Sequence, residues 1–67
     1  MQDYRYKIIE RLPDDPASER LIRYTVTRKG AMQIALRLAA DAIIRRTSRQ
    51  YIIRRIDKGG DTHGIYG

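Results

Sequence analysis

Cysteine is absent from this sequence of 67 residues, and acidic residues are outnumbered by basic ones. Without cysteine, neither disulfides nor thiolate-bound metal can supplement a small hydrophobic core. No apolar run approaches the roughly 18 residues that a transmembrane helix needs. The first residues also lack the basic and then apolar layout of a secretory signal. We therefore expect a soluble cytoplasmic protein that does not span a membrane or bind one, built as a single domain over residues 1–67.

An excess of lysine and arginine makes the chain strongly basic. Eight Asp and Glu stand against fourteen Lys and Arg, so the net charge is +6. Three of the acids, Asp14, Asp15 and Glu19, lie together in a segment without a basic residue. Concentrated positive charge attracts phosphate backbones and acidic protein surfaces. The sequence therefore predicts a small basic binding module whose partner is nucleic acid, a nucleoprotein complex or an acidic host protein.

The stretch from Gly30 to Arg46 has the clearest periodicity in the chain. Apolar residues recur there at the three-and-four spacing of one helix face, at Met32, Ala35, Leu36, Ala39 and Ile43. Polar residues recur every fourth position on another side, at Gln33, Arg37, Asp41 and Arg45. Ile34 and Leu38 widen the apolar arc, which indicates a helix lying on a sheet and ending near Thr47 and Ser48.

Two alternating segments, residues 4–12 and 21–28, precede this helix. Their patterns predict an antiparallel hairpin, joined by a long acidic loop that begins at Pro13. Residues 51–56 favour a third strand, although which of its alternating sets faces inward stays open. A Gly-Gly turn at 58–61 then allows a short edge strand at Ile65 and Tyr66. The predicted fold is α+β, with a small antiparallel sheet of three or four strands in the order ββαβ(β) and one helix on one face.

A second architecture stays open, in which Ser48 begins a second helix that runs through Arg55. Residues 21–56 would then resemble a ribbon-helix-helix repressor, with one strand followed by two helices. The resemblance implies a dimer formed through that strand, with Arg23, Thr25 and Thr27 reading the DNA major groove.

The leading functional candidate is the sheet face turned away from the helix. Alternation places apolar residues, including Tyr4, Tyr6 and Tyr24, on the helix side and basic residues on the opposite side. Arginine suits phosphate contacts because its guanidinium binds them in bidentate fashion, and threonine hydroxyls add donors. The predicted nucleic-acid or acidic-partner site comprises Arg5, Lys7, Arg11, Arg23, Thr25, Arg54 and Arg55. A solvated outer face explains the same pattern equally well.

Catalytic chemistry finds no support in the sequence. The only histidine, His63, lies near Asp57 and Asp61, which is a weak basis for a metal site. Lys29 and Gly30 precede the helix without the spaced glycines of a phosphate-binding loop. We expect a protein that is not an enzyme, with no catalytic residues, no metal and no cofactor.

Two isoleucines, Ile9 and Ile44, fall on polar sides of their predicted elements. They indicate a possible protein interface, so the protein is expected to be a monomer or a homodimer. In scale and layout only, a basic α+β chain of this size resembles the small proteins that phages use to block host machinery, including anti-CRISPR proteins. That resemblance implies an inhibitor or adaptor that docks on a host protein or nucleoprotein complex.

Overall fold

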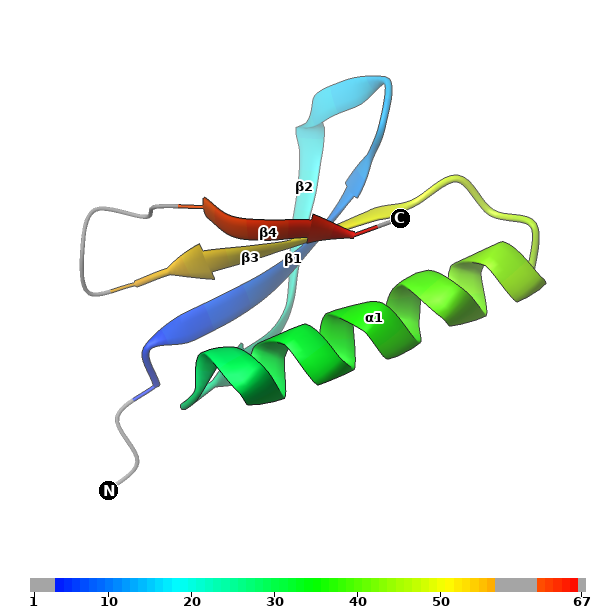
Figure 1. The fold of residues 1–67 in the computed structure, drawn as a ribbon. Coiled ribbons are helices and arrows are strands. Elements are labelled where there is room, and N and C mark those ends of the chain that lie inside the picture. The colour runs from blue at the N-terminus through cyan, green and yellow to red at the C-terminus, as the bar shows by residue number, and fades with distance from the viewer. Residues whose placement is uncertain (1–3, 57–61, 67) are drawn as a thin grey trace.

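A four-stranded antiparallel sheet carries one helix on one of its faces (Figure 1). This computed structural model describes residues 4–56 and 62–66. Its elements follow the chain as β1 (Tyr6–Leu12), β2 (Asp15–Thr25), α1 (Arg28–Ile44), β3 (Gln50–Arg55) and β4 (Thr62–Tyr66). The strand order in the sheet is β2-β1-β3-β4, so β1 and β3 are its central strands. The predicted ββαβ(β) fold is confirmed, and the ribbon-helix-helix alternative is wrong because residues 50–55 form a strand.

The β1–β2 hairpin turns more tightly than the sequence indicated. Leu12 pairs with Asp15, so Pro13 and Asp14 alone form the turn, and the predicted long acidic loop is wrong. Ser18 holds the tip, because its hydroxyl accepts a hydrogen bond from the Leu12 amide at 2.8 Å and donates one to the Asp15 carbonyl at 2.7 Å. Because β2 is an edge strand, it tolerates a proline that cannot donate to the ladder. The acidic segment is therefore part of β2.

A register shift in the hairpin changes which side chains of β2 face the helix. Ile8 pairs with Arg23 while Ile9 pairs with Leu21, so Ile22 is an extra residue opposite β1. Such a β-bulge reverses the alternation beyond it. As a result Tyr24 pairs with Lys7 and lies on the face away from the helix.

The bulge explains why Tyr24 and Val26, which were predicted to face the core, are 47% and 39% exposed. Tyr4, predicted to face the same side, precedes β1 and is 49% exposed. Tyr6 and Ile22 do pack against the core, as predicted. The buried cluster lies between the helix and the two central strands, with Ile8, Tyr51 and Ile53 from the sheet.

The helix turns its alanines toward the sheet. The buried residues of α1 are Ala31, Ala35, Ala39 and Ala42. Leu36 and Ile43, which the periodicity placed on the buried face, are 48% and 70% exposed, so that assignment is wrong. Methyl side chains let a helix pack closely on a sheet, where leucine or isoleucine would hold it further away. We call the exposed residues Leu36, Ile43 and Ile44 the helix stripe.

Both ends of α1 differ from the expected bounds of Gly30 and Arg46. Thr27 caps the start, since its hydroxyl accepts a hydrogen bond from the Gly30 amide at 3.0 Å. At the other end Arg46 adopts a left-handed conformation with a φ of 57°, and the Thr47 amide donates to the Ala42 carbonyl. This is the geometry of a Schellman motif with arginine at the position where glycine is usual.

The structure of β3 shows which of its two alternating sets of residues faces the helix. Tyr51 and Ile53 face the helix, whereas Ile52 and Arg54 alternate to the opposite face. The short edge strand predicted at Ile65 and Tyr66 exists as part of β4. The predicted turn at 58–61 lies outside the described residues. Among the residues described, no helix combines the length and apolar character needed to cross a membrane.

Candidate nucleic-acid interface

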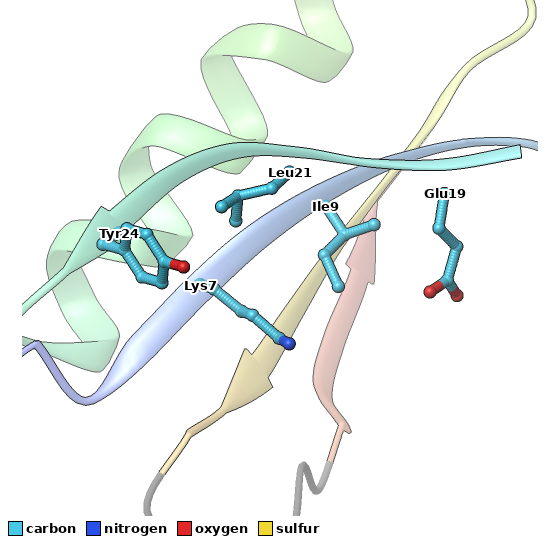
Figure 2. Close-up of a pocket in the computed structure, with 5 residues that line it drawn as sticks. All are labelled: Lys7, Ile9, Glu19, Leu21 and Tyr24. Atoms are coloured by element: carbon cyan, nitrogen blue, oxygen red, sulfur yellow. The ribbon is translucent and has the colours of Figure 1, made fainter.

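We call the side of the sheet away from α1 the open face. Its centre is apolar, because Ile9 and Ile52 are cross-strand partners there and are only 5% and 1% exposed. Ile9 was predicted to be exposed, and that part of the prediction is wrong, whereas its role in a protein interface stays a prediction. Beside it lies a shallow pocket formed by side chains from β1 and β2 (Figure 2). Lys7, Arg11 and Arg54 supply the positive charge of this face by strand alternation.

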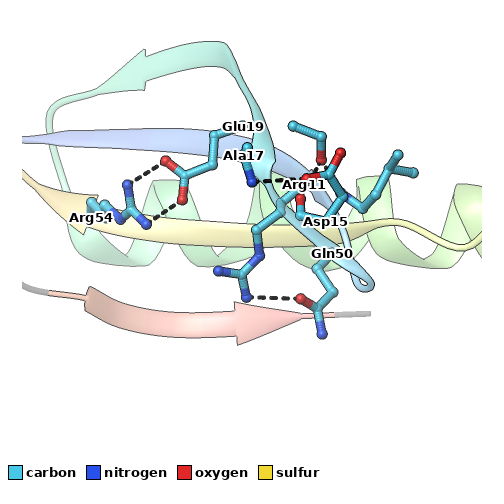
Figure 3. A network of polar contacts seen from close by, with 8 residues as sticks. Arg11, Asp15, Ala17, Glu19, Gln50 and Arg54 are labelled. Carbon is cyan, nitrogen blue, oxygen red and sulfur yellow. Dashed lines mark hydrogen bonds and ion pairs between the residues drawn. The ribbon is translucent and has the colours of Figure 1, made fainter.

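An ion pair crosses the open face from β3 to β2 (Figure 3). The guanidinium of Arg54 donates two hydrogen bonds to the carboxylate of Glu19, at 2.7 and 2.5 Å. Because β1 lies between these strands, the pair spans it on the side where Ile9 is buried. The hydrogen bonds from Arg54 lower the pKa of Glu19 below its ordinary value, and the charge of Arg54 adds to the effect. One predicted phosphate-binding cation therefore already has an acidic partner within the chain.

Arg11 is also engaged within the open face. Its Nη2 donates to the side-chain oxygen of Gln50 at 2.9 Å (Figure 3). Its Nε is buried without a hydrogen-bond partner among the described residues. Arg11 pairs with Gln50 toward the hairpin tip, away from Arg23 and Arg55. After the hydrogen bonds and charge of Arg54, the charge of Arg11 also lowers the pKa of Glu19.

Three of the predicted residues, Arg23, Thr25 and Arg55, do not lie on the open face. The bulge puts Arg23 opposite Ile8, on the helix side. Arg55 alternates to the same side, with its guanidinium carbon 6.0 Å from the centre of the Tyr6 ring. Thr25 pairs with Tyr6, is 7% exposed, and donates its hydroxyl to the Thr27 carbonyl. The prediction of one continuous basic sheet face is therefore wrong.

The topology gathers these cations in a different place, at one end of the fold. β1 begins, β2 and β3 end, and α1 begins at this end (Figure 1). We call it the basic end, and its cationic residues are Arg5, Lys7, Arg23, Arg28, Lys29, Arg54 and Arg55. Arg5 belongs to it because its amide donates to the Thr25 carbonyl and its carbonyl accepts from the Ile56 amide. Five of the seven predicted site residues are thus brought together here.

Within the part of the chain that the structure describes, acidic side chains are almost missing from the basic end. Among the described residues, only the carboxylate of Glu19 reaches it, through Arg54. Counting described residues only, seven cationic residues and one carboxylate give this end a charge of +6. Three aspartates and one lysine lie outside the described residues. If all four were assigned to the basic end, its net charge would still be +4.

Charges are better balanced in the rest of the described fold. Six arginines there stand against four acids, and two pairs are in contact. Arg20 lies 3.7 Å from Glu10, and Arg45 lies 3.1 Å from Asp41. Glu10 also accepts a hydrogen bond from the Tyr51 hydroxyl, and burial together with this bond raises the pKa of Tyr51.

Arg28 and Lys29 are the site residues that sequence reasoning missed. They occupy the first turn of α1, which contains no acidic residue. The positive end of a helix dipole favours anions, so two cations there are electrostatically unfavourable. The signal in the sequence was Thr27 three residues before Gly30, since a capping threonine would have moved the helix start to Arg28.

Comparison of the chain with protein-family models, curated proteins and solved structures found no match.

Proposed function

We propose that this protein binds nucleic acid through the phosphates, using the basic end, and acts as a binding module rather than an enzyme. The observation that carries the proposal is the concentration of seven cationic residues where only one described acid reaches. Neighbouring cations repel one another, and Arg28 and Lys29 add to this by facing the positive end of the helix dipole. A polyanion relieves both costs at once. Arginine, which supplies five of the seven, also makes bidentate phosphate contacts.

Salt dependence of binding tests this proposal directly. A fluorescently labelled oligonucleotide is titrated with the protein at several salt concentrations, and log affinity is plotted against log salt concentration. Phosphate contacts give a slope of about −0.7 per contact for a single strand and about −0.9 for a duplex. The double variant Arg28→Gln/Lys29→Gln should therefore make the slope shallower by about 1.4 to 1.8 and weaken binding.

The matched control removes the same charge from the opposite part of the fold. Arg45→Gln/Arg46→Gln should leave the slope unchanged, because these residues follow the carboxyl end of α1. Unfolding cannot mimic the expected loss, since removing cations from the first turn of a helix favours that helix. A flat salt response, or equal losses in both double variants, would overturn the proposal.

A second candidate function is docking on a protein, as expected of a small inhibitor or adaptor. The observation that favours it is the helix stripe, in which Ile43 and Ile44 are 70% and 79% exposed. Residues spaced seven and eight apart on a helix suit insertion into an apolar groove of a partner. The exposure predicted for Ile44 is thus confirmed, whereas its role in an interface stays a prediction.

Capture of partners from a host lysate, with and without nuclease, separates the two functions. Nucleic-acid binding predicts that captured material is lost after nuclease and lost in the Arg28→Gln/Lys29→Gln variant. Protein docking predicts a partner that survives nuclease and disappears in the Ile43→Gln/Ile44→Gln variant. A partner retained by both variants would count against both surfaces.

A further inference from the structure

The open face contains a pocket with a mixed lining. It encloses about 200 Å³ and is lined by Lys7, Ile9, Glu19, Leu21 and Tyr24 (Figure 2). Ile9 is buried, while Leu21 and Tyr24 remain 46% and 47% exposed. An ammonium group and a carboxylate complete the lining. Pockets for drug-sized ligands measure about 300–1,000 Å³, so this one suits a single ring system.

Tyr24 belongs to an exposed aromatic pair. Its ring centre lies 5.8 Å from that of Tyr4, with 42° between the ring planes. Tyr4 is 49% exposed, so both rings retain surface that water can reach. Had β2 kept its alternation, Tyr24 would face the core, and the bulge is what brings it to the open face beside Lys7. Aromatic surface at a basic site is what stacking on a nucleobase requires.

The polar groups of the pocket fit a base better than they fit an aliphatic chain. The carboxylate of Glu19 is an acceptor, and bases present amino and ring N–H donors along their edges. Arg54 holds that carboxylate in place with two hydrogen bonds. Lys7 lines the pocket and is also part of the basic end, so it can contact the phosphate next to a seated base.

We infer that this pocket receives one unpaired nucleobase, stacked on Tyr24, and that the nucleic acid bound by the protein is therefore single-stranded. The inference rests on the proposed function, because the basic end supplies the phosphate contacts. Lys7 is the cross-strand partner of both Tyr24 and Arg54. Because Lys7 belongs to both the pocket lining and the basic end, the two sites are adjacent. A duplex offers its bases only at the cost of unpairing and unstacking one of them. A single strand offers them freely.

The test compares a labelled single-stranded oligonucleotide with the duplex of the same length, for three proteins. The unaltered chain should prefer the single strand. Tyr24→Leu removes the ring at a half-exposed position and should weaken single-strand binding by about 5- to 150-fold, the range expected for one stacked base, with duplex binding unchanged. Tyr24→Phe keeps the ring and should retain the single-strand affinity.

The outcomes separate the pocket from the basic end. If Tyr24→Leu changes neither affinity while Arg28→Gln/Lys29→Gln weakens both, the pocket inference is overturned and the proposed function stands. Equal loss on both ligands with Tyr24→Leu also overturns the inference, because a base pocket distinguishes strands from duplexes. If the unaltered chain binds neither oligonucleotide, the proposed function and the inference fail together.

Discussion

Arg54 and Glu19 show how much one side-chain pair can decide in a chain of this size. The two residues come from strands that do not touch, and their hydrogen bonds pass over β1 between them. Their side chains are 26% and 30% exposed, so the pair is partly shielded from solvent. A shielded bidentate pair is stronger than an open surface ion pair. It fixes the position of the carboxylate in the pocket and ties the two sides of the sheet together.

Acid should weaken the fold through this pair. The hydrogen bonds from Arg54 lower the pKa of Glu19, so the native state binds that proton less readily than the unfolded chain. The pair thus contributes stability above the pKa of unfolded glutamate, about 4.3, and this contribution is lost as the pH falls through the lower native pKa. Denaturant midpoints measured from pH 7 down to pH 3 should fall more steeply for the unaltered chain than for Glu19→Gln.

The Glu19→Gln variant should also be the less stable protein at pH 7, where the pair is intact in the unaltered chain. The two curves should then converge in acid, once the carboxylate is protonated. Parallel curves across the whole pH range would show that the pair makes no contribution that depends on ionisation.

At the scale of elements, the presence of the helix was predicted, but the face that it turns toward the sheet was not. Alternating three-and-four spacing identified α1 because many apolar residues recur in it. These apolar residues cover so wide an arc of the helix that several faces are equally apolar. In the fold, the face that contains the alanines packs against the sheet. Similarly, strand alternation identified β1 and β2 but not the bulge near Ile22. A bulge depends on pairing between strands, which no local pattern encodes.

The choice of face by the helix gives a stability prediction. Ala35 is fully buried against the sheet, so Ala35→Leu should overpack the interface and lower the free energy of unfolding by about 1–3 kcal/mol. Ile44 is 79% exposed, so Ile44→Gln should change that free energy by less than about 0.5 kcal/mol. Urea denaturation of both variants measures the two values. The reverse order would show that the helix stripe, and not the alanine face, packs on the sheet.

For the molecule as a whole, the order of elements along the chain, ββαβ(β), could be predicted because each element has its own hydrophobic period and turn signals. The interface could not be predicted in the same way. Arg5, Arg28 and Arg55 are far apart in sequence, and the fold brings them to one end. Reasoning from alternation placed the cations on a face, because alternation says which side of a strand a residue occupies. Where along the strand each cation lies relative to its neighbours depends on register.

Charge at one end of the fold also sets the direction in which the molecule meets a ligand. Under the proposed function, a long-range field would turn the basic end toward a polyanion before any contact forms. The carboxyl end of α1, with Ile43 and Ile44, then faces outward (Figure 1). A nucleic-acid strand that is bound by several copies of the protein would present a row of these exposed isoleucines to its surroundings. Each bound molecule would become an attachment point for whatever fits those isoleucines.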